Sequence, residues 1–294
     1  MRRLTRSGRT GPNRQRRVQA LRFCYQREGL LLTVDRIAVL ALFDFEMRRD
    51  PVADEGYRVD RQGSVVRLIG RDDHCIVYSH FTAAEAASGV AEQTAEFRRR
   101  GQLLEWKVYA HDEPPVLSRL LAEAGYVPKP TETLMVFDLA EPLRAPPLPP
   151  GVEIRRITTP SGLDDFETVE HAAFGRDGSF ARRMLEGRLG NPDVGAYVAY
   201  RDGAPVAAGR VERAPGRSFA GIWGGGTVPP SRGLGLYRAL VAERAVWSRD
   251  RGAKYLMVEA LVDTSRPILA RIGFVPLSDV VGWELAPPGH DPTP

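Results

Sequence analysis

The alternation of apolar and polar residues predicts the same kinds of element before and after the middle of the chain. In the first half we expect helices over 28–49, 83–100 and 115–124, and strands in a hairpin over 57–70 and over 75–81, 104–110 and 131–139. In the second half we expect strands over 152–158, 195–201, 205–213, 219–228 and 254–261, and helices over 162–174, 180–189, 236 onward and 265–272. Strands mixed with helices throughout predict an α/β protein.

A proline-rich stretch separates the two halves. Residues 141–151 contain five prolines, and such segments form extended, semi-rigid spacers. We therefore predict one domain over 29–140, a linker over 141–151 and a second domain over 152–294.

A short internal repeat supports this division. Residues 121–128 read LAEAGYVP and residues 269–276 read LARIGFVP. Each segment follows a strand, a loop and a helix with proline near its start, and each precedes a strand. The matched context favours an internal repeat over coincidence.

The stretch with the clearest chemistry is a strand, a glycine-rich turn and a helix over 219–240. Three consecutive glycines at 224–226 interrupt the strand, and glycine inside a strand marks a bulge or the close approach of a ligand. Pro229 and Pro230 end the strand, and RGLG at 232–235 leads into the helix. Unpaired N–H groups and the dipole at a helix N-terminus favour an anion, so this turn suits a pyrophosphate. A turn that needs its glycines only for geometry is the alternative.

Two common phosphate-binding motifs do not fit this turn. No Gly-x4-Gly-Lys-Ser/Thr run is present, and the dinucleotide fingerprint would need glycine in place of Arg238. The turn instead resembles the coenzyme A loop of the GCN5-related N-acetyltransferase (GNAT) family, Arg/Gln-x-x-Gly-x-Gly/Ala after a strand ending in Val-x-Pro. Residues 232–236 match behind Val228, whereas Tyr237 stands where the family has a small residue. A following strand and a short helix ending in Gly-Phe extend the resemblance over about 152–285.

The resemblance implies two acetyltransferase-like units in tandem, each a central, mostly antiparallel sheet flanked by helices. It also implies acetyl-CoA as co-substrate, with its pantetheine arm between the splayed strands 219–228 and 254–261 and an N–H of the bulge stabilising the oxyanion. The residues that it assigns to acetyl-CoA are Thr227, Val228, Arg232, Gly233, Leu234, Gly235, Leu236, Tyr237 and Ser265.

The catalytic acid stays open. The family often uses a tyrosine five residues before the Gly-Phe phenylalanine, and that position is Leu269 here. Another group protonates the thiolate, or the thiolate leaves unaided, or the acceptor differs. Tyr237 is one candidate acid, with a packing or ribose contact as its alternative role. Ser265 is either a coenzyme contact or a helix N-cap.

For the catalytic base, Glu259 is the strongest candidate. It lies in an apolar strand, where burial would raise the pKa of its carboxyl toward neutrality. The alternative is an ion pair with an arginine such as Arg210 on a neighbouring strand. Glu212 and His171 are weaker candidates. For His171 the reason is that a lone helical histidine is more often structural.

The first half lacks a counterpart of the phosphate loop. Residues 80–85 read HFTAAE, with neither glycine nor arginine, and Glu85 would repel a phosphate. We therefore expect a degenerate N-terminal unit that does not bind coenzyme A. It would wall the acceptor site or contribute to a homodimer contact.

Charge matters mainly at the N-terminus. Nine of the 41 basic residues precede Glu28, which leaves 32 basic residues against 37 acidic ones. We interpret residues 1–28 as a basic, disordered tail rather than as an arm that binds nucleic acid. Two distant cysteines indicate neither a disulfide framework nor a metal site. The longest apolar runs are too short to span a membrane, and a reducing cytoplasm is the expected compartment.

These features predict an acetyl-CoA-dependent N-acetyltransferase. The acceptor would be an amine on a small molecule or peptide, whose identity is not readable because acceptor pockets share no code. A non-catalytic acyl-CoA sensor is the alternative, consistent with the leucine at 269. A nucleic-acid-associated role through the arginine-rich tail is a third interpretation.

Overall fold

A computed structural model describes residues 35–53, 56–71, 73–175 and 179–287. The predicted basic tail, residues 1–28, lies outside the described residues. In the first half the elements are α1 (Arg36–Phe43), η1 (Asp44–Arg49), β1 (Arg58–Gln62), β2 (Val65–Ile69), β3 (Asp73–Ser79), α2 (Ala86–Arg100), β4 (Leu103–Tyr109), α3 (Leu117–Glu123), β5 (Val127–Pro128) and β6 (Glu132–Asp138). In the second half they are β7 (Val152–Arg156), α4 (Pro160–Phe174), α5 (Ser179–Leu185), β8 (Val194–Arg201), β9 (Ala204–Arg213), β10 (Phe219–Thr227), η2 (Pro229–Ser231), α6 (Leu236–Asp250), β11 (Tyr255–Leu261), α7 (Ser265–Arg271) and β12 (Val275–Leu285).

In the described residues, the expected first helix consists of an α-helical part, α1, and a π-helical part, η1. Asp35 caps α1, because its Oδ1 accepts from the N–H groups of Ile37 and Ala38 at 3.2 Å. The α-helical turns then pass into the wider π-helical turns of η1, which end before Pro51. Elsewhere the predicted elements are present, with ends displaced by a few residues.

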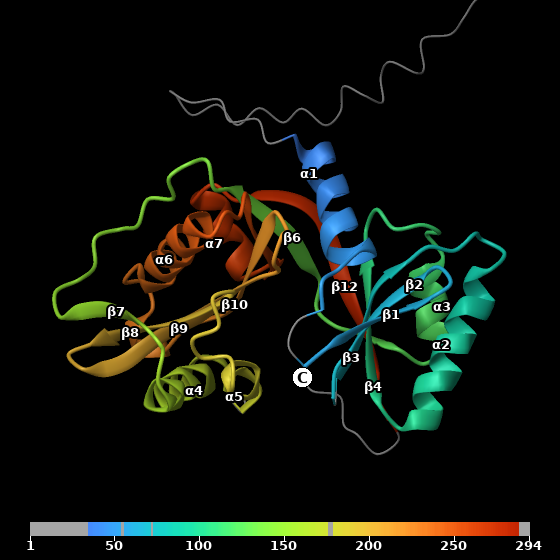
Figure 1. The fold of residues 1–294 in the computed structure, drawn as a ribbon, viewed down its shortest axis with the longest axis horizontal. Coiled ribbons are helices and arrows are strands. Elements are labelled where there is room, and N and C mark those ends of the chain that lie inside the picture. The colour runs from blue at the N-terminus through green and yellow to red at the C-terminus, as the bar shows by residue number, and fades with distance from the viewer. Residues whose placement is uncertain (1–34, 54–55, 72, 176–178, 288–294) are drawn as a thin grey trace, which may run out of the picture. The chain divides into compact units, whose positions relative to one another are not determined.

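The strands form one mixed, mostly antiparallel sheet in the order β1-β2-β3-β4-β12-β6-β11-β10-β9-β8-β7, with β5 beside β12 (Figure 1). Two of its pairings, β3 with β4 and β10 with β11, are parallel. Each parallel pair belongs to one half and is joined through a helix, as a parallel connection requires. The predicted fold class is confirmed.

The two halves exchange their last strands. β6 of the first half pairs antiparallel with β11, from Tyr255↔Asp138 to Leu261↔Glu132. β12 of the second half pairs antiparallel with β4, from Val280↔Tyr109 to Leu285↔Leu104. β6 and β12 also pair with each other. The repeated segments therefore lead into strands with equivalent places in the sheet. Strands from before and after the proline-rich spacer belong to this one sheet. The assignment of separate domains stays a prediction.

Alternation along the strands of the second half divides its core between two faces. Ala207 and Val211 of β9 belong to the cluster under α6 and α7, whereas the intervening Ala208 belongs to the cluster under α4. We call these the α6 face and the α4 face. Glu259 and Met257 of β11 lie on the α4 face, because the alternate residues Leu256, Val258 and Ala260 are buried against α6 and α7.

Candidate functional site

The parallel strands β10 and β11 separate partway along their length. Their pairing covers Phe219↔Tyr255 to Gly221↔Met257 in the described residues, while β10 remains paired with β9 as far as Thr227. The register of β10 shifts between Trp223 and Gly226, and Gly224 has φ 58°. The side of β10 that faces β11 is thus open beyond Gly221. An extended ligand could hydrogen-bond to this edge as an added strand.

The predicted phosphate loop lies at the end of this opening. Gly233 and Gly235 have φ 80° and 81°, and Gly235 is the N-cap of α6. The N–H groups from Gly233 to Arg238 have no acceptor among the described residues, since the first bond into the helix is from Ala239 N to the Gly235 carbonyl, 3.0 Å. No acidic residue stands in the first turn of α6. This arrangement of unpaired donors suits an anion.

Arg232 is the side chain that braces the loop. Its Nε donates to the Thr227 carbonyl at 3.2 Å and its Nη2 to the Ala173 carbonyl at 3.0 Å. The Val228 N–H donates to the Val206 carbonyl at 3.0 Å. Eight of the nine residues predicted for acetyl-CoA therefore lie along the end of β10, the loop after it and the start of α6. The ninth, Ser265, lies at the start of α7.

Ser265 is not the N-cap of its helix. The cap is Thr264, whose side chain makes no capping hydrogen bond. One of the two roles considered for Ser265 is thus wrong, because the helix begins one residue earlier than that role requires. The coenzyme contact stays a prediction.

Tyr237 packs against the bulge of β10. A Cβ atom added at Gly225 would lie 2.7 Å from Tyr237 Cε2, so the absence of a side chain at Gly225 makes room for the ring. Burial raises the pKa of the Tyr237 hydroxyl, and the charge of Arg244 opposes this rise. Leu269 lies fully buried in the core of the α6 face, 0% exposed, and offers no proton.

The expected environment of Glu259 is wrong in two respects. Its side chain is 4% exposed and binds the ammonium of Lys107 and the hydroxyl of Tyr109, both on β4. Arg210 instead binds Glu212 at 3.0 Å. Burial raises the pKa of the Glu259 carboxyl, but the charge and hydrogen bond of Lys107 and the hydrogen bond of Tyr109 together outweigh burial and hold this pKa below its ordinary value. Its role as a base stays a prediction, without the expected shift toward neutrality.

Glu132 is a candidate base that the sequence analysis missed. It pairs with Leu261 across β6 and β11, so it shares the α4 face with Glu259 one strand away. Burial, reinforced by the negative charge of Glu259, raises the pKa of the Glu132 carboxyl to about 7. Its place at the start of a strand was visible in the sequence, but its neighbour on β11 was not.

Glu170 is the second carboxylate that the sequence analysis missed. It lies on α4, 5% exposed, and a Cβ atom added at Gly224 would be 3.0 Å from its Oε1 and 3.4 Å from Arg210 Nη1. His171, the weaker candidate on the same helix, is exposed. The α4 face of the bulge therefore carries Glu170 and Arg210. The helical period of α4 could have indicated that Glu170 is on its buried stripe with Phe166.

The first half has a carboxylate where the second half has its phosphate loop. Glu85 Oε2 accepts from the Thr82 N–H at 3.0 Å and from the Thr82 hydroxyl at 2.7 Å, at the start of α2. This carboxylate occupies the position that an anion would need.

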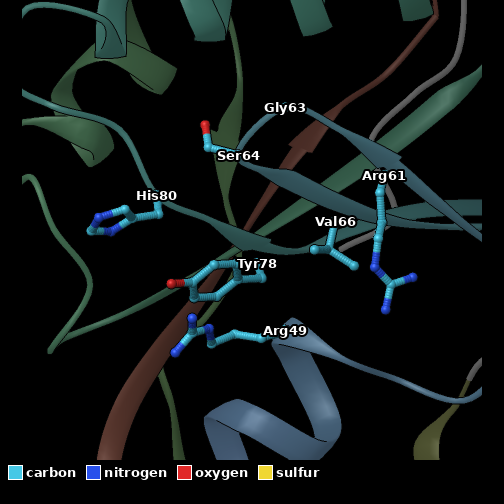
Figure 2. A pocket seen from close by; sticks show the side chains of 7 residues that line it. All are labelled: Arg49, Arg61, Gly63, Ser64, Val66, Tyr78 and His80. Carbon is cyan, nitrogen blue, oxygen red and sulfur yellow. The ribbon is translucent and has the colours of Figure 1, made fainter.

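A cavity of about 310 Å³ opens elsewhere in the first half (Figure 2). Its lining consists of Arg49, Arg61, Gly63, Ser64, Val66, Tyr78 and His80. Arg61 is bound to Asp50 at 2.8 Å, and the Arg49 guanidinium lies 5.7 Å from the Tyr78 ring centre. None of the residues predicted for acetyl-CoA lines this cavity.

Metal-binding clusters and membrane-spanning helices are both absent from the described part of the chain. None of its groups of histidine, cysteine, aspartate and glutamate has three members placed to hold a metal ion. None of its helices is both long and apolar enough to cross a membrane.

Known proteins resemble both the second half and the whole fold. Residues 160–274 match the model of the acetyltransferase (GNAT) family. A mycothiol acetyltransferase from Cellulomonas flavigena is 29% identical over 167 residues, which are 51% of this chain and 48% of that protein. The match thus spans about half the length of this curated relative.

Solved structures extend the likeness to most of the chain. A GCN5-related N-acetyltransferase from Kribbella flavida superposes with a TM-score of 0.64 at 19% identity, over 87% of this chain and 95% of that one. A tandem GNAT protein from the clavulanic acid biosynthesis pathway superposes with a TM-score of 0.57 at 19% identity, over 81% and 86%. These superpositions show the fold, and the family model identifies the segment 160–274 as similar to the acetyltransferase domain of the GNAT family.

Proposed function

We propose that this protein transfers an acetyl group from acetyl-CoA to an amine. The observation that carries the proposal is the continuous path from the opening between β10 and β11 to the unpaired N–H groups that begin α6. We expect the backbone of Thr227 and Val228 to bind the pantetheine arm and residues 232–237 to bind the pyrophosphate. The acetyl carbonyl would then lie at the glycine bulge.

The acceptor amine would approach from the α4 face. An ammonium must lose a proton before it can attack, and a base with a pKa near neutrality does this best. We therefore assign that proton to Glu132, directly or through water. Glu259, the base expected from the sequence, would act by its charge, which raises the pKa of Glu132. Glu170, at the bulge itself, is the alternative base, and the pH profiles of Glu132→Gln and Glu170→Gln separate the two.

The test of the proposal is calorimetric titration of acetyl-CoA into the wild type, Gly235→Glu and Gly235→Ala. Both variants strain a residue at φ 81° and bring a Cβ atom to 3.1 Å from Pro146 Cγ. Only the glutamate adds a negative charge at the loop. We expect binding by the wild type and the alanine variant, and none by the glutamate variant.

Two results would overturn the proposal. If the wild type does not bind, the loop only imitates a coenzyme site. If the glutamate variant binds like the alanine variant, acetyl-CoA binds elsewhere in the chain.

A sensor that binds acyl-CoA without turnover is the second candidate. The observation in its favour is the buried, apolar Leu269, which leaves α7 without an acid. Tight acetyl-CoA binding without thiol release over a broad panel of amines would support it.

A further inference from the structure

Arg244 is a buried cation that has no carboxylate partner among the described residues. It lies on α6 and is 1% exposed. Its Nε donates to the Leu240 carbonyl at 3.0 Å, and its Nη1 donates to the carbonyls of Arg210 and Trp223 at 3.1 and 3.4 Å. Its Nη2 is buried and has no acceptor in the described part of the chain, and no described carboxylate oxygen comes within 4.0 Å of the group.

A guanidinium in this position is costly. Removing a charge from water costs several kcal/mol unless an opposite charge or enough hydrogen bonds compensate it. The titratable groups whose charge influences Arg244 are those of Tyr237, Tyr197 and Arg210. Burial lowers the pKa of Arg244 to about 10, so it remains charged at neutral pH. Such a charge is most readily explained by an anion that the protein binds.

The free nitrogen lies beside the glycine bulge of β10. A Cβ atom added at Gly225, in the bulge, would lie 3.6 Å from Arg244 Nη2 and 2.7 Å from Tyr237 Cε2. A Cβ atom added at Gly209 on β9 would lie 2.8 Å from Arg244 Nη1. Two glycines in adjacent strands thus make room for this arginine and this tyrosine beneath the bulge.

We propose that Arg244, with Tyr237 beside it, stabilises the negative charge that acetyl transfer leaves on the coenzyme sulfur. This inference rests on the proposed function, because it needs the thioester at the bulge. The amine nitrogen attacks the thioester carbon, a C–N bond forms, and the C–S bond breaks with its electron pair moving to sulfur. Tyr237 donates its proton to the thiolate and regains one from water, while the proton lost by nitrogen goes to a carboxylate of the α4 face.

The alternative is that Arg244 only clamps the carbonyls of β9 and α6. That role would use Nε and Nη1 and would leave Nη2 without a purpose. It would also be satisfied whether or not coenzyme A is bound. A measurement on the bound sulfur itself therefore separates the two roles.

The test measures the acidity of the thiol of coenzyme A while it is bound, which requires no acceptor. The ultraviolet absorbance of the thiolate is followed against pH for complexes of the wild type, Arg244→Met and Arg249→Met. The same titrations with an analogue that lacks the sulfur remove the contribution of protein tyrosines. Arg249→Met is the matched control, because Arg249 is an exposed arginine on the same helix.

We expect the bound thiol of the wild type to titrate about 1 pH unit or more below the free thiol, as beside an opposite charge. Arg244→Met should remove this shift, and Arg249→Met should keep it. If Arg244→Met does not fold, the wild type alone decides: a bound thiol that titrates at or above the value of free coenzyme A overturns the inference. If coenzyme A does not bind at all, the proposed function fails first. Binding with an unshifted thiol refutes only the role of Arg244.

Tyr237→Phe tests the proton donor separately. It removes one hydroxyl and keeps the ring against Gly225. The backbone N–H at position 237, which we expect to bind the pyrophosphate, is the same in both proteins, so coenzyme binding should be kept. Thiol release should slow about 100-fold or more, as for loss of a general acid. Unchanged release at every pH would exclude Tyr237 as the donor.

Discussion

Replacing Glu132 by glutamine should stabilise the protein much more at pH 8 than at pH 5. The pKa of Glu132 is about 7 in the folded protein and 4.5 in its ordinary state. The folded state therefore binds this proton more tightly than the unfolded state does. As pH rises from 4.5 to 7, the unfolded chain releases this proton while the folded protein keeps it, so the unfolding free energy falls.

The magnitude follows from the two pKa values. At pH 8 the ionised carboxylate costs about 3 kcal/mol, and at pH 5 it costs about 1 kcal/mol. Glutamine has nearly the same shape and carries no charge, so Glu132→Gln removes this cost. The variant should gain about 3 kcal/mol of unfolding free energy at pH 8 and about 1 kcal/mol at pH 5.

Urea unfolding followed by tryptophan fluorescence at both pH values measures these differences. Glu243→Gln is the control, because Glu243 is an exposed carboxylate on α6, and its effect should stay below about 0.5 kcal/mol at either pH. A gain of equal size at pH 5 and pH 8 would refute the reasoning, since it would not depend on ionisation. A loss at pH 8 would show that the charged form of Glu132 is stabilised by a partner.

Two further substitutions test the core of the site. Glu259→Gln should lower the unfolding free energy by about 3 kcal/mol at pH 7, because it leaves the Lys107 charge without its partner. In urea unfolding, the double variant Lys107→Met/Glu259→Leu should recover most of this loss. No recovery would contradict the ion-pair explanation. Leu269→Ala should lower the unfolding free energy by about 2–5 kcal/mol, because it leaves a cavity in the core. Calorimetry should find acetyl-CoA binding unchanged in the folded variant. A smaller loss of unfolding free energy would mean that the core around position 269 collapses onto the smaller side chain.

Local geometry explains why the loop could be predicted from the sequence. Prolines 229 and 230 and the glycines at 233 and 235 act on their own backbone and nearest neighbours. The positive φ values of both glycines and the start of α6 at Leu236 match what those residues require. The unpaired N–H groups follow from the same local arrangement. A sequence is most informative where the cause lies within a few residues of its effect.

Pairing between distant segments explains what was missed. A strand pattern in residues 131–139, like the strand expected after the repeated segment 269–276, indicates that a strand forms, but not which neighbour it takes. Lys107 and Glu259 meet although 152 positions separate them. Arg210, the partner expected for Glu259, lies on β9 and binds Glu212 instead. The exchange of β6 and β12 is what brings β4 close enough for Lys107 to take that place.

Arg244 was missed although the sequence held a signal. It follows Leu240 by four residues and precedes Trp247 by three, so it stands on the apolar stripe of α6. Tyr237 lies seven residues earlier on the same stripe. A charged residue at such a position is either paired or functional. Only the structure shows that its free nitrogen lies beside the glycine bulge of β10.

The exchange of strands gives the first half a part in the site without a coenzyme loop of its own. Glu132 lies on β6, which this half contributes to the sheet beside β11. Lys107 and Tyr109 lie on β4 and hold Glu259 charged. That charge raises the pKa of Glu132 toward neutrality. If the amine loses its proton to Glu132, the half that binds coenzyme A supplies the acyl donor and the leaving-group site, while the other half supplies the base and the cation that tunes it. The first half would then remain necessary although it carries a carboxylate in place of a phosphate loop, because it supplies both the base and the cation that sets the charge of Glu259.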